Sequence, residues 1–225
     1  MPLIIENIRW VFFDLGYTLI NEDGAAFGRL RQVCDSLAEL GVKVTLADLV
    51  RDLEEASERY DPSPFASVLD RLIPDPQQQD LVRKSGRYPK ELEEPYPDAK
   101  PLLTALAGRY QLGVIANQPA GTEQRLRNYG LDSFFSVCLS STEMGIAKPD
   151  PEIFRIALEQ AGCRPRDAVM VGDRIDNDIK PAKSLGMQTV RILQGVGRLQ
   201  KPRTDDERPD ATVKDLAELA TILID

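Results

Sequence analysis

The stretch RWVFFDLGYTL, from Arg9 to Leu19, sets the fold that the rest of the chain follows. Its uninterrupted apolar run, Trp10–Phe13, predicts a strand that is buried on both faces between helices. The chain turns polar directly afterwards, which places Asp14 at the carboxyl end of the strand, the edge where open parallel sheets bind ligands. A carboxylate there can be a nucleophile, a metal ligand or both. The alternative is that Asp14 only caps the turn after the strand.

Composition and charge exclude several classes of protein. With 225 residues, 42% of them hydrophobic, the chain can form one large domain or a core with an insert. The net charge of -8 argues against nucleic-acid or anionic-membrane binding but allows a small phosphorylated substrate. Histidine is absent, which removes Ser-His-Asp catalysis, Cys-His catalysis and His-ligated zinc. Nothing in the sequence predicts the oligomeric state.

The cysteines and the N-terminal segment indicate a cytoplasmic protein. Cys34, Cys138 and Cys163 are far apart and odd in number, which fits neither a disulfide framework nor a zinc site. We expect them to be small buried side chains in a reducing compartment. The segment MPLIIENIRW lacks a basic region followed by a long apolar run, so neither a signal peptide nor a membrane span is expected.

Residues 21–95 predict a helical domain inserted after the first strand. Apolar residues recur at helical spacing from Phe27 to Leu40, and Gly41 ends the run. Thr45 is expected to N-cap a second helix that ends near Tyr60. Shorter helices are expected over 65–72 and 77–85, and no strand pattern is present in this region.

Residues 96–225 alternate between helix and strand patterns, which predicts an α/β fold with a doubly wound parallel sheet. Together with residues 1–20 they are expected to form a Rossmann-like core domain. The segment Gly195–Asp210 is expected to be a surface loop with solvated charges. The expected strands cover 112–116, 137–139, 168–171, 189–193 and 211–213, and the expected helices 100–109, 122–129, 151–160, 179–185 and 216–224.

Polar residues follow several of these strands at what should be the same edge of the sheet. Asp14, Asn117 and Asp173 each come directly after a strand. Lys148 lies just ahead of a helix that Asp150 can N-cap, a position that favours anions. On its own, Lys148 would be interpreted as a solvated surface residue.

The segment VGDRIDNDI brings three carboxylates close together in the sequence: Asp173, Asp176 and Asp178. Such groups repel one another unless a cation is present, and Mg²⁺ prefers oxygen ligands of this kind. We expect Asp173 in the site, because it directly follows a buried strand. Asp176 is expected to lie on the loop or to cap the next helix, with no role in the site.

DLGYTL, the strand ending in Asn117, the lysine of GIAKPDPEIF and VGDRIDNDI resemble, in order and context, the four motifs of the haloacid dehalogenase-like hydrolase superfamily. The resemblance covers the core from residue 8 to about residue 193, and the helical insert resembles that superfamily's cap domain. It implies a phosphohydrolase acting on a small phosphorylated metabolite. Asp14 would attack the phosphorus and form an aspartyl-phosphate, which water then hydrolyses.

The resemblance also implies roles for the other residues. Mg²⁺ would be held by the Asp14 carboxylate, the backbone carbonyl of Gly16 and Asp173, with Asp178 acting directly or through water. Lys148 would pair with both Asp14 and the phosphate. Substrate-binding roles are expected for Thr18, Asn117 and Lys148, and cap residues would select the leaving group.

Two departures from the superfamily pattern weaken the functional prediction. Most of its phosphatases carry a second aspartate, a general acid and base, where this chain has Gly16. The Ser or Thr whose hydroxyl usually holds the phosphate is Ala116 here, and Asn117 could partly replace it as a donor. Loss of general acid assistance costs on the order of 10²–10⁴ in rate.

Three interpretations remain open. The first is a Mg²⁺-dependent phosphatase that obtains its proton from Tyr17 or water, or needs none because its leaving group is good. The second is a metal-free 2-haloacid dehalogenase, which would need an arginine in the cap to hold halide, such as Arg29 or Arg31. The third is a non-enzymatic binding protein. The acidic cluster favours the first interpretation over the second, and the retention of all four motif residues favours it over the third.

Overall fold

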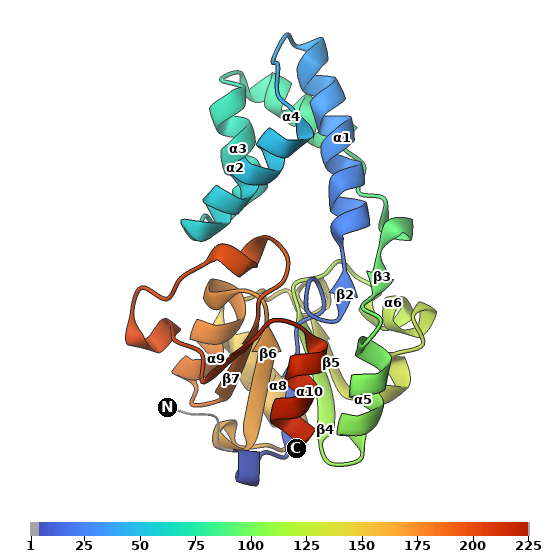
Figure 1. Cartoon of the computed structure of the whole chain (residues 1–225), viewed down its shortest axis with the longest axis vertical. Coiled ribbons are helices and arrows are strands. Elements are labelled where there is room, and N and C mark those ends of the chain that lie inside the picture. The colour runs from blue at the N-terminus through green and yellow to red at the C-terminus, as the bar shows by residue number, and fades with distance from the viewer. Residues whose placement is uncertain (1–4, 225) are drawn as a thin grey trace. The chain divides into compact units, whose positions relative to one another are not determined.

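The computed structural model describes residues 5–224 and divides into two compact units (Figure 1). Of the described residues, the α/β unit contains 5–21, 94–194 and 201–224, and the helical unit contains 22–93 and 195–200. The segment 195–200 was expected in the core domain, but it packs with the helical unit. There the side-chain amide of Gln200 donates to the carbonyl of Ser57 at 3.1 Å, and Arg198 pairs with Glu54.

The α/β unit is built on one parallel sheet of six strands, in the order β5-β4-β1-β6-β7-β8. Counted along the sheet's own strands this is the order 3-2-1-4-5-6 of Rossmann folds, so the predicted doubly wound sheet is confirmed. From β1 the chain first adds β4 and β5 on one side of the sheet, and it then adds β6, β7 and β8 on the other side of β1. The strands are β1 (Trp10–Phe13), β4 (Gln111–Ala116), β5 (Phe135–Ser140), β6 (Ala168–Gly172), β7 (Gln188–Ile192) and β8 (Ala211–Val213).

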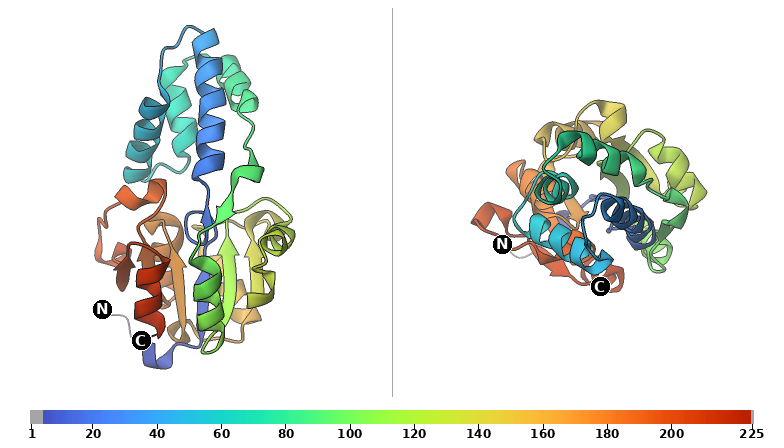
Figure 2. Two further views of the ribbon diagram at one scale, coloured as in Figure 1. Left: turned by 45° about the vertical axis from the view of Figure 1, so that its right-hand side comes forward. Right: turned by 90° about the horizontal axis from the view of Figure 1, so that it is seen from above.

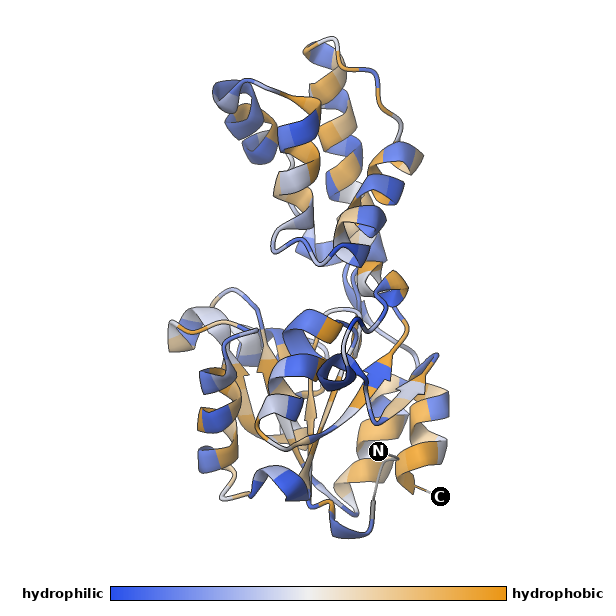
Figure 3. Ribbon diagram, turned by 90° about the vertical axis from the view of Figure 1, so that its left-hand side faces the viewer, coloured by the Kyte–Doolittle hydropathy of each residue, from blue (hydrophilic) through white to orange (hydrophobic). Residues whose placement is uncertain are grey.

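Helices cover both faces of this sheet, and its strands are largely hydrophobic (Figure 3). Val11 and Phe13 of β1 face a core that includes α5 (Ala99–Ala107) and α10 (Leu216–Ile224). Phe12 faces the opposite core, with α8 (Pro151–Gln160) and α9 (Lys180–Ser184). The apolar run of β1 is thus buried on both faces, as predicted. Two short helices, α6 (Thr122–Asn128) and α7 (Ser141–Met144), follow β4 and β5.

The helical unit contains four α-helices (Figure 2). Their apolar side chains form a core of their own. The helices are α1 (Asp23–Glu39), α2 (Leu46–Glu58), α3 (Pro64–Leu72) and α4 (Pro76–Ser85). Gly41 adopts a φ of +79° just after α1, which explains why the helix ends there. Thr45 and Asp48 form a capping box at the start of α2, which confirms Thr45 as the N-cap.

Three features of the α/β unit differ from the prediction. β2 (Ile20–Asn21) and β3 (Glu94–Pro95) form a short antiparallel pair, too short to show a periodic pattern. A π-helical turn, Ile175–Ile179, precedes α9. Glu207 is buried and pairs with Lys180 at 3.0 Å, so the expectation that the charges of 195–210 are all solvated is wrong.

No helix within residues 5–224 combines the length and the apolar character needed to cross a membrane.

Candidate active site

The side chain of Lys148 joins two carboxylates at the carboxyl edge of the sheet. Its Nζ lies 2.6 Å from Oδ1 of Asp14 and 2.6 Å from Oδ1 of Asp178. All three side chains are buried or nearly so. Burial alone lowers the pKa of Lys148, but the charges of Asp14 and Asp178 outweigh it and the net shift is upward. The amine is therefore a permanent cation inside the site.

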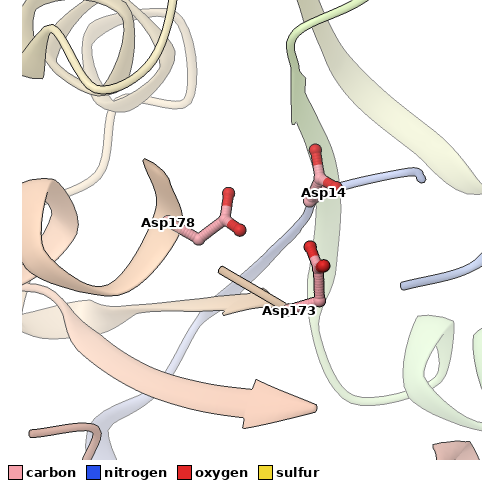
Figure 4. A group of neighbouring side chains, drawn as sticks. All are labelled: Asp14, Asp173 and Asp178. Carbon is pink, nitrogen blue, oxygen red and sulfur yellow. The ribbon is translucent and has the colours of Figure 1, made fainter. Parts of the chain in front are cut away.

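Three aspartates converge at this edge from two neighbouring strands and the turn that follows (Figure 4). Asp14 follows β1 and Asp173 follows β6, which are paired in parallel, while Asp178 lies on the π-helical turn. One carboxylate oxygen from each residue lies within 4.8 Å of those from the other two. The prediction that Asp14 and Asp173 lie close together at one sheet edge is therefore confirmed.

Burial makes this cluster electrostatically costly without a further cation. Burial, together with the charges of Asp178 and Asp14, raises the pKa of the Asp173 carboxyl well above its usual range. Burial, only partly offset by the Lys148 ammonium, raises the pKa of Asp178 to about 6. Burial and mutual repulsion therefore favour the protonated forms of Asp173 and Asp178 unless a further cation balances their charge.

The backbone around motif VGDRIDNDI is shaped to bring Asp178 into the site. A Cβ atom on Gly172 would lie 2.4 Å from Cγ and 2.5 Å from Cβ of Asp178, so only glycine leaves room for this carboxylate. The backbone N–H of Arg174 donates to Oδ2 of Asp178 at 3.0 Å. A π-helical turn, a form often found at functional sites, carries Asp178 itself.

Asp176 lies outside the cluster, as expected. Its carboxylate accepts from Nε of Arg174 at 3.0 Å and also pairs with the Nη2 of the same side chain. This fork-like contact gives Asp176 its own counter-ion.

Asn117 follows β4, but its side chain is directed at the backbone of Lys148. Its Nδ2 donates to the carbonyl of Lys148 at 2.8 Å, and its Oδ1 accepts from the N–H of Lys148 at 2.8 Å. Ala116, the last residue of β4, is fully buried and offers no hydroxyl. The role of Asn117 as a substrate donor stays a prediction, while its contact with Lys148 was not foreseen.

The loop after Asp14 contains the other predicted site residues. Within residues 5–224 no hydrogen bond ends on the carbonyl of Gly16, which leaves it available as a ligand. Tyr17 adopts a φ of 54°, a conformation that costs an ordinary side chain roughly 1–2 kcal/mol. Thr18 is fully buried, and its hydroxyl has no hydrogen-bond partner in the part of the chain that the structure describes. The substrate-binding role of Thr18 stays a prediction.

The donor set fits a small, hard divalent cation. Three buried carboxylates and a free carbonyl offer only oxygen ligands, with neither imidazole nor thiolate among them. Oxygen donors are those that Mg²⁺ and Ca²⁺ select, whereas zinc and copper sites draw on nitrogen and sulfur. Arg191, buried on β7, donates from Nε to the carbonyl of Asp173 at 3.3 Å and so supports the backbone of one donor residue.

Comparison with known proteins identifies the family. The model of the haloacid dehalogenase-like hydrolases matches residues 8–186. A glyceraldehyde 3-phosphate phosphatase of Methanopyrus kandleri is 32% identical over 96% of this chain and 97% of its own length. An α/β hydrolase with an inserted helical unit is therefore the class that the fold and the site define. The chain belongs to the haloacid dehalogenase-like hydrolases.

Two solved structures that resemble this chain are described as different kinds of enzyme. A Haemophilus somnus protein described as a predicted phosphoglycolate phosphatase shares the fold with a TM-score of 0.74 at 22% identity, over 97% of this chain and 99% of its own. A 2-haloacid dehalogenase of Pseudomonas syringae has a TM-score of 0.61 and 29% identity, over 96% and 98% of the two chains. Both have the family fold, so the fold does not distinguish phosphatase from dehalogenase.

Proposed function

We propose that this protein is a Mg²⁺-dependent phosphohydrolase that acts on a small phosphorylated metabolite through an aspartyl-phosphate on Asp14. The observation that carries the proposal is the buried group of three aspartates, two of which share the ammonium group of Lys148. A metal-free mechanism gives no reason to bury so much negative charge, whereas a divalent cation would balance it. Asp14, Asp173, Asp178 and the carbonyl of Gly16 would hold the ion.

In this proposal the two oxygens of Asp14 have distinct tasks. Lys148 holds Oδ1, which leaves Oδ2 as the atom that attacks phosphorus. The new bond joins Oδ2 to phosphorus while the ester oxygen departs with its electron pair and takes up a proton from water or from Tyr17. Water then attacks the same phosphorus, releases orthophosphate and restores the carboxylate. When bound, the metal ion would offset the repulsion between the carboxylate and the phosphate.

Small phosphate esters are the proposed substrate class, with glyceraldehyde 3-phosphate as the first to test. The support is that the phosphatase of M. kandleri matches almost the whole chain, including the helical unit. The three cysteines are free thiols in the structure, in keeping with the reducing cytoplasm that we propose as the compartment.

The test is phosphate release from a panel of small phosphate esters, measured with Mg²⁺ and with EDTA. The panel contains glyceraldehyde 3-phosphate, sugar phosphates, nucleotides and acyl phosphates. We expect turnover of at least one ester that stops in EDTA and returns with excess Mg²⁺. Turnover that is unaffected by EDTA would contradict the metal dependence. Failure of the folded protein to hydrolyse any ester would contradict the phosphatase proposal.

One observation keeps the dehalogenase as a second candidate. Arg29 lies over the ring of Phe65 at 4.1 Å, and within the described residues it pairs with no carboxylate. Its Nε is buried and has no hydrogen-bond partner among residues 5–224, and burial lowers the pKa of the guanidinium. A guanidinium in this state is suited to holding a halide or another anion. Chloride release from a 2-chloroacid in EDTA, lost in Arg29→Gln but retained in the exposed Arg31→Gln, would establish this alternative.

Replacing Gly16 with aspartate is expected to raise phosphatase activity by on the order of 10²-fold, because it restores a proton donor beside Asp14. The gain should appear with alkyl phosphates, whose leaving oxygen needs a proton. It should be small with an aryl phosphate such as p-nitrophenyl phosphate, whose phenolate leaves unprotonated. An alkyl phosphate rate that does not rise in a folded Gly16→Asp variant would refute the idea that proton donation limits turnover.

A further inference from the structure

The side-chain amide of Asn117 and the backbone of Lys148 form a two-way hydrogen bond across 31 positions of sequence. Nδ2 of Asn117 donates to the Lys148 carbonyl, and Oδ1 accepts from the Lys148 N–H, each at 2.8 Å. Both polar groups of one backbone residue are therefore held by one side chain. Asparagine suits this pairing, because its amide presents a donor and an acceptor side by side, as a peptide group does.

The loop that carries Asn117 is itself held by hydrogen bonds to the helix α7. The N–H of Gln118 donates to Oγ of Ser141 at 3.1 Å, and the N–H of Gly121 donates to Oε1 of Glu143 at 2.9 Å. The hydroxyl of Ser140 donates to the other oxygen of Glu143 at 2.8 Å. These hydrogen bonds lower the pKa of Glu143, so it is a stable anion and a constant acceptor. The loop that carries Asn117 is therefore held in place by its hydrogen bonds to Ser141 and Glu143.

Lys148 needs such support because its side chain must reach two acceptors at once. Nζ lies 2.6 Å from both Asp14 and Asp178, at the end of a flexible four-carbon chain. The chain around Lys148 is irregular, and the next regular element is α8, which begins at Pro151. A displacement of about 1 Å at a catalytic group can cost on the order of 10²-fold in rate.

We propose that Asn117 is the positioning residue of Lys148: its amide fixes the lysine backbone so that Nζ meets the carboxylates of Asp14 and Asp178. The inference deepens the proposed function and rests on it for its kinetic part. Asn117 acts through Lys148, so its removal should impair catalysis only as far as Lys148 contributes. A loss of catalysis that depends on Lys148 distinguishes a positioning role of Asn117 from a contribution to fold stability and from direct binding of the phosphate.

A double-mutant cycle of Asn117→Ala and Lys148→Met tests this dependence. Asn117→Ala is expected to lower kcat by about 10–100-fold while KM changes by less than about threefold. In the Lys148→Met background the same substitution should change kcat by less than about threefold. Asn128→Ala, which removes an exposed asparagine from α6, is the matched control and should leave kcat unchanged. A kcat of Asn117→Ala within threefold of wild type, or an equal loss in both backgrounds, would overturn the proposal.

The exchange rate of the Lys148 amide proton supplies a readout that needs no activity. Asn117→Ala removes the acceptor of that N–H, so its exchange, followed by NMR, should accelerate at least about tenfold. Exchange at the wild-type rate would overturn the proposal even if turnover fell. If the wild-type protein hydrolyses no phosphate ester, the proposed function fails, and the exchange rate alone decides whether Asn117 fixes Lys148.

Discussion

Asp14→Asn is expected to abolish phosphate release, with a loss in kcat on the order of 10⁴-fold or more. Oδ2 of Asp14 is the atom assigned to attack phosphorus, and an amide in its place is a much poorer nucleophile. The substitution preserves shape, and the pairing of β1 with β4 and β6 involves Trp10–Phe13 and not Asp14. Phosphate release in steady state and a search for phosphorylated protein after acid quenching measure the effect.

Asp205→Asn is the matched control for this substitution. Asp205 lies in the same unit, its side chain is 97% exposed, and it pairs with Arg208 at 3.1 Å. It should retain full activity and, after quenching, the same level of phosphorylated protein as wild type. A folded Asp14→Asn protein that keeps a tenth of wild-type kcat would show that another group performs the attack.

Gly172→Ala is expected to weaken Mg²⁺ binding by about 10–100-fold, the range observed when supporting residues of metal sites are replaced. The new methyl would lie 2.5 Å from Cβ of Asp178, an atom too close to the backbone to move alone. The π-helical turn must therefore shift, and it would carry the carboxylate away from Asp14 and Asp173. Calorimetric Mg²⁺ titration measures the affinity, and turnover at saturating substrate should need correspondingly more Mg²⁺.

Gly108→Ala provides the control for adding a methyl group to this unit. A Cβ at Gly108 would meet no atom closer than 3.6 Å, so this variant should fold and bind Mg²⁺ as wild type does. Wild-type Mg²⁺ affinity in Gly172→Ala would mean that Asp178 is not part of the binding site.

The position of the candidate site was predictable because the strand patterns are strong. The four apolar residues Trp10–Phe13 end at a carboxylate, and the same change of pattern recurs at Asn117 and Asp173. In a parallel sheet the carboxyl ends of the strands lie at one edge, so the strand pattern alone predicted that these residues lie close together. Lys148 was different: its neighbourhood predicted only a helix start, and its place in the site came from the family resemblance.

Contacts between loops could not be predicted from the sequence. The hydrogen bonds between Asn117 and Lys148 join two irregular segments, and no periodic pattern encodes which loops meet. The packing of Gly195–Gln200 with the helical unit was missed for the same reason. The sequence does indicate close packing at Gly172, because a glycine stands directly before Asp173. That the neighbouring group is the carboxylate of Asp178 is seen only in the structure.

Titration of Mg²⁺ into the metal-free protein, followed by calorimetry, tests most directly whether the three buried aspartates form a cation site. At pH 7.5 we expect one ion per chain, and Asp173→Asn should remove most of this binding. Because the pKa of Asp178 is raised to about 6 and that of Asp173 is also raised, lowering the pH to 5 protonates ligands and should weaken binding. No saturable binding at pH 7.5, or equal binding by wild type and Asp173→Asn, would contradict the account.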